Sequence, residues 1–245
     1  MTILLVDKIQ DSEKIIDEYY ERLACFMSEI VGTQEYRVVV EGGCGPGTLS
    51  RPLSSLLHEE SLYVCYDLFS GVYNSSLQSL TDKRLGCPII QGDIRCMGIH
   101  TGSVDLVFTH ELLCELTEPD TLITLKEIYR ILADGGLYIN GVLSPYPETR
   151  AQELVVLADA HSSHPLFEKT WFSPPADTLA GMLHLTGFSH IHIRYYDLSL
   201  RFTGECAFDR LKKWEIGPEF YAQYAGEVET YGLELPMVQV VSCTK

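Results

Sequence analysis

Basic residues are scarce in this sequence, and their scarcity limits the partners that the protein can bind. The chain has 245 residues, with 18 Lys and Arg against 34 Asp and Glu, which gives a formal net charge of −16 at pH 7. A surface of this charge repels the phosphates of nucleic acids and of anionic membranes. The densest basic stretch is the pair Lys212 and Lys213, so we expect neither a nucleic-acid nor a membrane partner. A cationic or neutral small molecule, or a protein, is easier to reconcile with this charge.

Long apolar runs and paired cysteine motifs are also missing. The N-terminal stretch "MTILLVDKIQ" has an apolar run of only four residues and no basic leader, which predicts neither a signal peptide nor a membrane span. The eight cysteines form no C-x-x-C pair, a pattern that favours buried reduced thiols over disulfides or metal ligands. A cytoplasmic location is therefore the expectation.

Short apolar runs alternate with segments of helical periodicity along most of the chain. Alternation of this kind predicts a mostly parallel sheet with helices on both faces and right-handed crossovers. The predicted strands are 37–40, 61–67, 87–93, 103–110, 137–143, 189–197 and 236–243, and the predicted helices are 12–31, 48–57, a stretch through Tyr73, Leu77 and Leu80, 121–132 and 174–188.

No internal repeat or flexible linker interrupts this pattern, so we predict a single domain over residues 1–245. Its expected parts are an N-terminal helical cap (1–35), a core (36–203), an insert (204–232) and a last strand (233–245). The insert breaks the alternation and is rich in aromatic side chains, among them Trp214 and Phe220. We expect it to form one or two packed helices.

The stretch "VVVEGGCGPGTLS", residues 38–50, has four glycines within six positions directly after a β-branched run. In an open α/β sheet, the first turn from strand to helix commonly approaches a ligand most closely. A dinucleotide fingerprint needs Gly-x-Gly-x-x-Gly, but the sixth position is Thr48 when counted from Gly43 and Ser50 when counted from Gly45. No Gly-Lys-Ser/Thr follows, so a phosphate-binding Walker loop is excluded as well.

The turn instead has an acid at the strand end and a glycine at every second position, namely Glu41, Gly43, Gly45 and Gly47. This arrangement resembles the first motif of the class I S-adenosylmethionine (SAM)-dependent methyltransferases, in particular the small-molecule branch of the ubiquinone and menaquinone biosynthesis type. A ligand without phosphate needs backbone free of side chains against its amino-acid part, which glycines supply. Gly42 departs from the family, which usually has an aliphatic residue there.

Later segments resemble further motifs of this family over about residues 36–197 and the last strand. Asp67, followed by Leu68, resembles the acid that accepts the ribose hydroxyls, and Asp93 resembles the acid that accepts from the adenine amine, with the backbone of Ile94 nearby. The stretches "SVDLVFTHELLCEL" and "EIYRILADGGLYI" resemble the fourth-strand motif and the turn into the fifth strand. The resemblance implies a Rossmann-like sheet of seven strands whose last strand is antiparallel and inserted between the fifth and sixth.

The same resemblance implies methyl transfer from SAM to a small-molecule acceptor at oxygen, nitrogen, sulfur or carbon. His110, at the end of the fourth predicted strand, is the candidate general base, with Glu111 beside it. The backbone of His110 lining the donor site is an equally weighted alternative. A methyltransferase-fold binding or regulatory subunit and a protein methyltransferase also stay open.

Two histidine pairs, His161 with His164 and His190 with His192, lack a third ligand at motif spacing. Structural zinc sites take four ligands and catalytic sites three. We therefore expect no metal site.

Overall fold

The protein is described from a computed structural model, which places residues 11–68, 87–162 and 174–245. The chain forms two compact units. We call residues 20–144, 168–197 and 237–245 the sheet unit, and residues 1–19, 145–167 and 198–236 the helical unit. Helix α1 (Ser12–Val31) contributes residues to both units. The boundaries of these two units differ from those of the predicted cap, core, insert and last strand. The predicted division of a single domain stays a prediction.

The sheet unit is built on seven strands in the order β3-β2-β1-β4-β5-β9-β6. Neighbouring strands from β3 to β5 pair in parallel, whereas β9 lies between β5 and β6 and is antiparallel to both. This order confirms the Rossmann-like sheet and the inserted last strand that the resemblance implied. The strands are β1 (Val38–Gly42), β2 (Leu62–Asp67), β3 (Ile89–Gln91), β4 (Val104–His110), β5 (Leu132–Leu143), β6 (Ser189–Tyr196) and β9 (Val238–Thr244).

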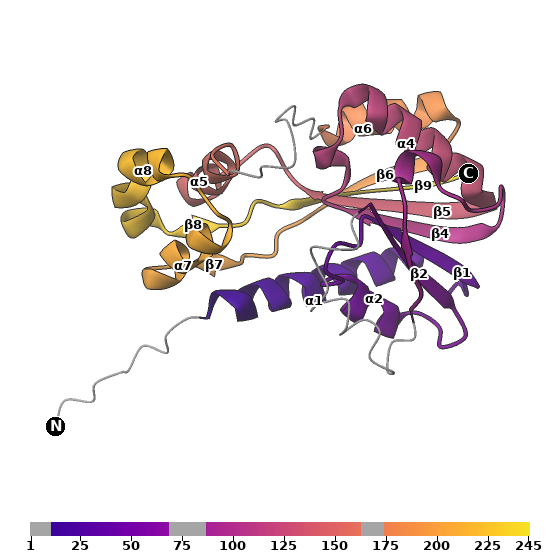
Figure 1. Cartoon of the computed structure of the whole chain (residues 1–245), viewed down its shortest axis with the longest axis horizontal. Helices are drawn as coiled ribbons and strands as arrows, with labels where there is room; N and C mark the ends of the chain where they lie inside the picture. Colours follow the sequence, from indigo (N-terminus) through magenta and orange to yellow (C-terminus); the bar gives the residue numbers. More distant parts are fainter. Residues whose placement is uncertain (1–10, 69–86, 163–173) are drawn as a thin grey trace. The chain divides into compact units, whose positions relative to one another are not determined.

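Helices cover both faces of this sheet. Helices α4 (Glu118–Ile131) and α6 (Ala176–Thr186) lie together on one face, as Figure 1 shows. They enclose a core that includes Ile128, Leu183 and Tyr138 of β5. Side chains alternate along a strand, so Gly141 faces away from that core. A Cβ built on Gly141 would lie 2.7 Å from Cε of Met27, which places the sheet-unit part of α1 on the opposite face.

Helices α2 and α4 of the sheet unit begin in different ways. Helix α2 (Ser50–Leu56) starts directly after the glycine turn without a side-chain cap. Helix α4 is capped by Thr117, whose hydroxyl accepts from the backbone N–H of Asp120. A cap of this kind satisfies one of the unpaired donors at a helix start. The residues that precede α4 are thereby fixed at the carboxyl end of β4.

The helical unit contains α5 (Arg150–Asp159), α7 (Glu205–Lys213) and α8 (Pro218–Tyr231). It also holds a small antiparallel pair of strands, β7 (Arg201–Phe202) with β8 (Leu233–Glu234). Arg150 of α5 and Glu227 of α8 form an ion pair of 2.6 Å between Nε and Oε2. The expectation of one or two helices within 204–232 is confirmed.

Three features differ from the sequence expectations. Helix α5 and the strands β7 and β8 were not predicted, β3 is shorter than 87–93, and β5 begins at Leu132 instead of 137. The predicted helical stretch through Tyr73 and Leu80 lies outside the described residues. Among the residues that the structure places, no helix has the length and hydrophobicity of a membrane span.

Candidate functional site

The glycine turn leaves the carboxyl end of β1 and doubles back toward β2. Gly43, Gly45 and Gly47 all have positive φ, at 71°, 48° and 77°. This region is costly for residues with a Cβ and accessible to glycine. The backbone N–H of Gly43 donates to the carbonyl of Tyr66 at 2.8 Å, so the turn is held against the end of β2. Alternate glycines therefore have a conformational reason in this turn.

The glycines of the turn differ in how much space a side chain would find beside them. A Cβ on Gly43 would lie 2.8 Å from Cδ1 of Leu112, and one on Gly42 would lie 2.6 Å from Cδ1 of Ile94. A Cβ on Gly45 would meet no described atom within 4 Å. Gly42 and Gly43 are thus tightly packed against neighbouring side chains, while Gly45 leaves room beside its backbone. The Ile94 side chain fills the place where the family usually has an aliphatic residue.

Asp67 ends β2 and reaches the glycine turn. The backbone N–H of Gly45 donates to Oδ2 of Asp67 at 2.8 Å, and the Asp67 carbonyl accepts from the N–H of Gly92 at 2.8 Å. Leu68 follows with its side chain exposed. The structure therefore brings the predicted ribose acid and the glycine turn within one hydrogen bond of each other.

Glu41 is buried at the base of the turn, with an exposed fraction of 2%. Its Oε2 accepts from the hydroxyl of Ser50 at the start of α2 and from the hydroxyl of Tyr63 in β2, the latter at 2.7 Å. Burial raises the pKa of Glu41 to about 7, against the opposing effect of these two hydrogen bonds. Glu41 thus joins β1, α2 and β2 beneath the turn, and its predicted contact with the donor stays a prediction.

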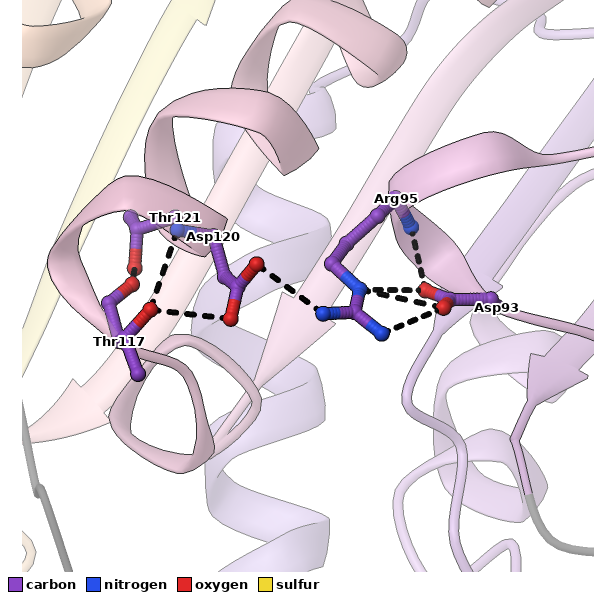
Figure 2. Close-up of polar contacts among 5 residues, drawn as sticks. All are labelled: Asp93, Arg95, Thr117, Asp120 and Thr121. Carbon is purple, nitrogen blue, oxygen red and sulfur yellow. Dashed lines mark hydrogen bonds and ion pairs between the residues drawn. The ribbon is translucent and has the colours of Figure 1, made fainter.

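Asp93 follows β3 and caps the short helix η1 (Ile94–Cys96). Figure 2 shows its carboxylate bound to the backbone N–H and to the guanidinium of Arg95. The backbone N–H donates at 2.9 Å, and the shortest guanidinium contact, Nη2 to Oδ2, is 2.7 Å. These hydrogen bonds hold the pKa of Asp93 below its usual range. Asp93 is therefore an ionised hydrogen-bond acceptor, which suits a contact with the exocyclic amine of a nucleobase.

His110 ends β4 opposite Gly141 of β5. Its Nδ1 lies 3.0 Å from the carbonyl oxygen of Gly141, and its ring meets that of Tyr20 edge to face, with centroids 5.9 Å apart. Because a carbonyl oxygen only accepts, this contact fixes the proton on Nδ1 and leaves the lone pair on Nε2. Burial lowers the pKa of His110 to about 4, so the ring is neutral at neutral pH.

Glu111 bridges the ends of β4 and β5. Its φ of 48° is unusual for a residue with a side chain, and strain of this kind is often found at functional sites. Its Oε1 accepts from the backbone N–H of Leu143 at 2.6 Å, and its own N–H donates to Gly141 at 3.1 Å. These contacts suit a residue that holds the two strand ends beside His110 better than one that transfers a proton. Its catalytic assignment stays a prediction.

The described histidines of the two pairs make local contacts. His161 is in the helical unit, with Nδ1 2.7 Å from the carbonyl of Leu157, and His164 lies outside the described residues. His190 contacts Thr244 through Nδ1 at 3.0 Å. Within residues 11–68, 87–162 and 174–245, no group of three or more His, Cys, Asp and Glu side chains is arranged to hold a metal ion.

The predicted residues lie at the carboxyl ends of the parallel strands. One group surrounds the glycine turn, and the other is His110 with Glu111 at the end of β4. Glu41, the glycines and Asp67 are connected around β1 and β2, and Ile94 touches Gly42 from the β3 side. Sequence reasoning missed Ser50, Tyr63 and Arg95, which hold the two acids. Arg95 could have been noticed, because a basic residue two positions after an acid commonly pairs with it in a turn.

Comparison with known proteins finds one family match and several similar structures. Residues 39–136 match the family described as "Methyltransferase domain". The YcgJ protein of Bacillus subtilis has a similar structure, with a TM-score of 0.69, 12% sequence identity and coverage of 91% of this chain and 98% of that one. A SAM-dependent methyltransferase of Archaeoglobus fulgidus aligns with a TM-score of 0.59 and 13% identity over 92% of this chain and 94% of its own.

A third similar structure carries ligands. The phosphoethanolamine N-methyltransferase 2 of Haemonchus contortus, in complex with phosphomonomethylethanolamine and S-adenosylhomocysteine, aligns with a TM-score of 0.62 and 12% identity over 98% of this chain and 59% of that chain. At these identities the three structures establish the fold. Residues 39–136 therefore match a methyltransferase domain, and the sheet has the Rossmann-like fold of the SAM-dependent methyltransferases.

Proposed function

We propose that the sheet unit binds SAM at the carboxyl edge of β1, β2 and β4 and transfers its methyl group to a small organic acceptor. The observation that carries this proposal is the hydrogen bond from the Gly45 N–H to Asp67, together with the open space beside Gly45. A bare backbone and an acid lie side by side there, as a ligand with an amino-acid part and a ribose requires. The phosphate-binding alternatives fail on spacing.

The residues take separate parts in this proposal. The turn from Gly43 to Gly47 lies against the amino-acid part of the donor, and Asp67, followed by Leu68, accepts from the ribose. Asp93 accepts from the adenine amine, and the backbone of Ile94 lies beside the base. Glu41 supports the turn from below through Ser50 and Tyr63. The S-adenosylhomocysteine in the Haemonchus contortus enzyme supports SAM as the donor.

The bound donor supplies a methyl group on a positively charged sulfur, which keeps the bonding electrons when the methyl leaves. The protein therefore has to align the acceptor, exclude water and, for a protonated acceptor, remove a proton. Nε2 of His110 is the candidate to receive that proton. With a pKa of about 4 it is a weak base. A neutral amine, which attacks before it loses a proton, or a thiol, which ionises readily, suits it better as an acceptor than an alcohol, which needs a stronger base.

The charge of the chain supports the remaining parts of the proposal. A net charge of −16 disfavours nucleic-acid and membrane partners. All eight cysteines lie in the described part of the chain, where six are buried and none forms a disulfide, in keeping with a cytoplasmic location. A binding or regulatory subunit would share the donor residues and show no turnover. An enzyme with a protein acceptor would share the donor residues and differ in the acceptor that it methylates.

Calorimetry on the purified protein with SAM and with S-adenosylhomocysteine tests the donor site. Asp67→Ala should weaken both by about 1.5 to 3 kcal/mol, the usual cost of losing charge-assisted hydrogen bonds. Asp134→Ala is the control, because Asp134 is fully exposed at the amino-terminal start of β5, at the other edge of the sheet. Absence of binding by the unmodified protein would reject the proposed function. Equal losses in both variants would reject the assignment of Asp67.

A further inference from the structure

Arg95 lies between two acids that come from different parts of the sheet unit. Its Nε contacts Oδ1 and Oδ2 of Asp93 at 3.0 and 3.1 Å, and its Nη2 contacts Oδ2 at 2.7 Å. On the other side, its Nη1 contacts Oδ1 of Asp120 at 3.0 Å. Figure 2 shows the guanidinium extended between the two carboxylates. The planar fork of arginine matches a carboxylate geometrically and holds it in one orientation.

Asp120 anchors this arrangement to a rigid element. It lies in the first turn of α4, where Thr117 donates its hydroxyl to Oδ2 of Asp120 at 2.9 Å and caps the helix. Thr121 donates its hydroxyl to the carbonyl of Thr117 at 3.0 Å. The guanidinium is thus held by a capped helix start, and it transmits that rigidity to Asp93, which lies in an irregular segment after β3.

The number of acceptor positions on Asp93 leaves a place for a ligand. An ionised carboxylate offers about four lone-pair positions. The backbone N–H of Arg95 donates to Oδ1, its Nη2 donates to Oδ2, and the single proton of its Nε is shared between Oδ1 and Oδ2. Three protons therefore face about four acceptor positions. About one position remains, and the Asp93 side chain is 28% exposed, so this position can be reached from outside. The direction of the remaining lone pair is set by the three bonds to Arg95.

We propose that Arg95 is a positioning residue that orients the Asp93 carboxylate toward the 6-amino group of the donor and thereby sets the preference for adenine over 6-oxopurines. This inference depends on the proposed function. The ion pair also keeps Asp93 ionised, since it lowers its pKa. An ionised carboxylate only accepts, so a 6-oxo group placed against it would put two acceptors together without a proton between them.

The test compares two ligands that differ at this position. Binding of S-adenosylhomocysteine and of its deaminated 6-oxo analogue, S-inosylhomocysteine, is measured by calorimetry, and the ratio of the two affinities is the readout. The unmodified protein should prefer the adenine ligand by about 100-fold or more, because a site built to pair with a donor rejects an analogue that lacks it. Arg95→Ala should lower this ratio by about tenfold, because the carboxylate loses its fixed orientation.

Two further variants separate positioning from charge and from general stability. Arg95→Lys keeps the charge without the fork and should restore the ratio only in part. Arg150→Ala is a matched control in the helical unit, where Arg150 is likewise held by two carboxylates, Glu227 and Glu153, each at 2.6 Å. It should leave the ratio unchanged.

The outcomes separate this inference from the proposed function. Failure of the unmodified protein to bind S-adenosylhomocysteine would reject the proposed function and this inference with it. Normal binding with an unchanged ratio in Arg95→Ala would overturn the inference alone, as would complete recovery of the ratio in Arg95→Lys. A fall in thermal stability of Arg95→Ala with no change in the ratio would reduce Arg95 to a structural ion pair.

Discussion

Burial of Glu41 should make the stability of the sheet unit depend on pH in a direction that is unusual for a carboxyl group. Its pKa is raised from 4.5 to about 7 in the folded protein, and the main cause is burial. Between these two pH values the folded state keeps a proton that the unfolded state has released. The free energy of unfolding therefore falls as the pH rises, because its slope follows the protons bound in the unfolded state minus those bound in the folded state.

The magnitude follows from the width of this interval. The interval spans about 2.5 pH units, and each unit corresponds to about 1.4 kcal/mol. The stabilisation from Glu41 is fully present below about pH 4.5 and is lost by the time the pH passes about 7. We expect this one group to lower the free energy of unfolding by at most about 3.5 kcal/mol.

Glu41→Gln removes the ionisation and keeps an oxygen that can accept from Ser50 and Tyr63. Urea denaturation of the unmodified protein and of the variant, at pH 5 and at pH 8, gives the difference between the two pH dependences. The other titrating groups are the same in both proteins, so their contributions to the pH dependence cancel in the difference. Glu59→Gln, in the exposed turn before β2, is the control and should leave the pH dependence as it is. Identical pH dependence in the unmodified protein and in Glu41→Gln would refute the reasoning.

Further predictions concern the glycine turn and the histidine. Gly45→Val should lower donor affinity by about 100-fold or more while the far-ultraviolet circular dichroism stays native. A β-branched residue resists the φ of 48° and would occupy the space beside the turn. Normal binding in calorimetry would mean that the glycines serve packing alone. His110→Ala should leave the affinity for S-adenosylhomocysteine nearly unchanged and lower the single-turnover rate with an identified acceptor by about 100-fold or more. The pH profile of that variant should lose its acidic limb, near pH 4, and an unchanged rate at saturating donor would remove His110 from catalysis.

Much of the sheet could be predicted because its strands are buried and rich in β-branched residues. The run from Val38 to Val40 and the run from Val104 to Phe108 are nearly all buried, as central strands of a parallel sheet are. Helix α5 was missed although its signals are present. Ala151, Leu154 and Ala158 are buried at helical spacing, and Thr149 caps the helix. Strands β7 and β8 have two residues each, too few to show any alternation.

The candidate site was predicted by position, whereas its interactions were not. The spacing of the glycines located the turn, and the strand ends located Asp67 and Asp93. The burial of Glu41 and the low pKa of His110 depend on what surrounds them in three dimensions, which strand patterns do not specify. Arg95 meets Asp120 across 25 positions of sequence, and no periodicity indicates such a contact.

The contact between Gly42 and Ile94 has a consequence for how this chain can diverge. A Cβ at position 42 and the δ-methyl of Ile94 would compete for the same volume, since they would be 2.6 Å apart. The two positions should therefore mutate as a pair: Gly42→Ala alone should be destabilising, and Ile94→Val, which removes that methyl, should compensate for it. In relatives whose strand-ending acid is followed by an aliphatic residue, the position that corresponds to Ile94 should carry a smaller side chain. Sequence drift at position 94 is thus constrained by a residue of the first strand.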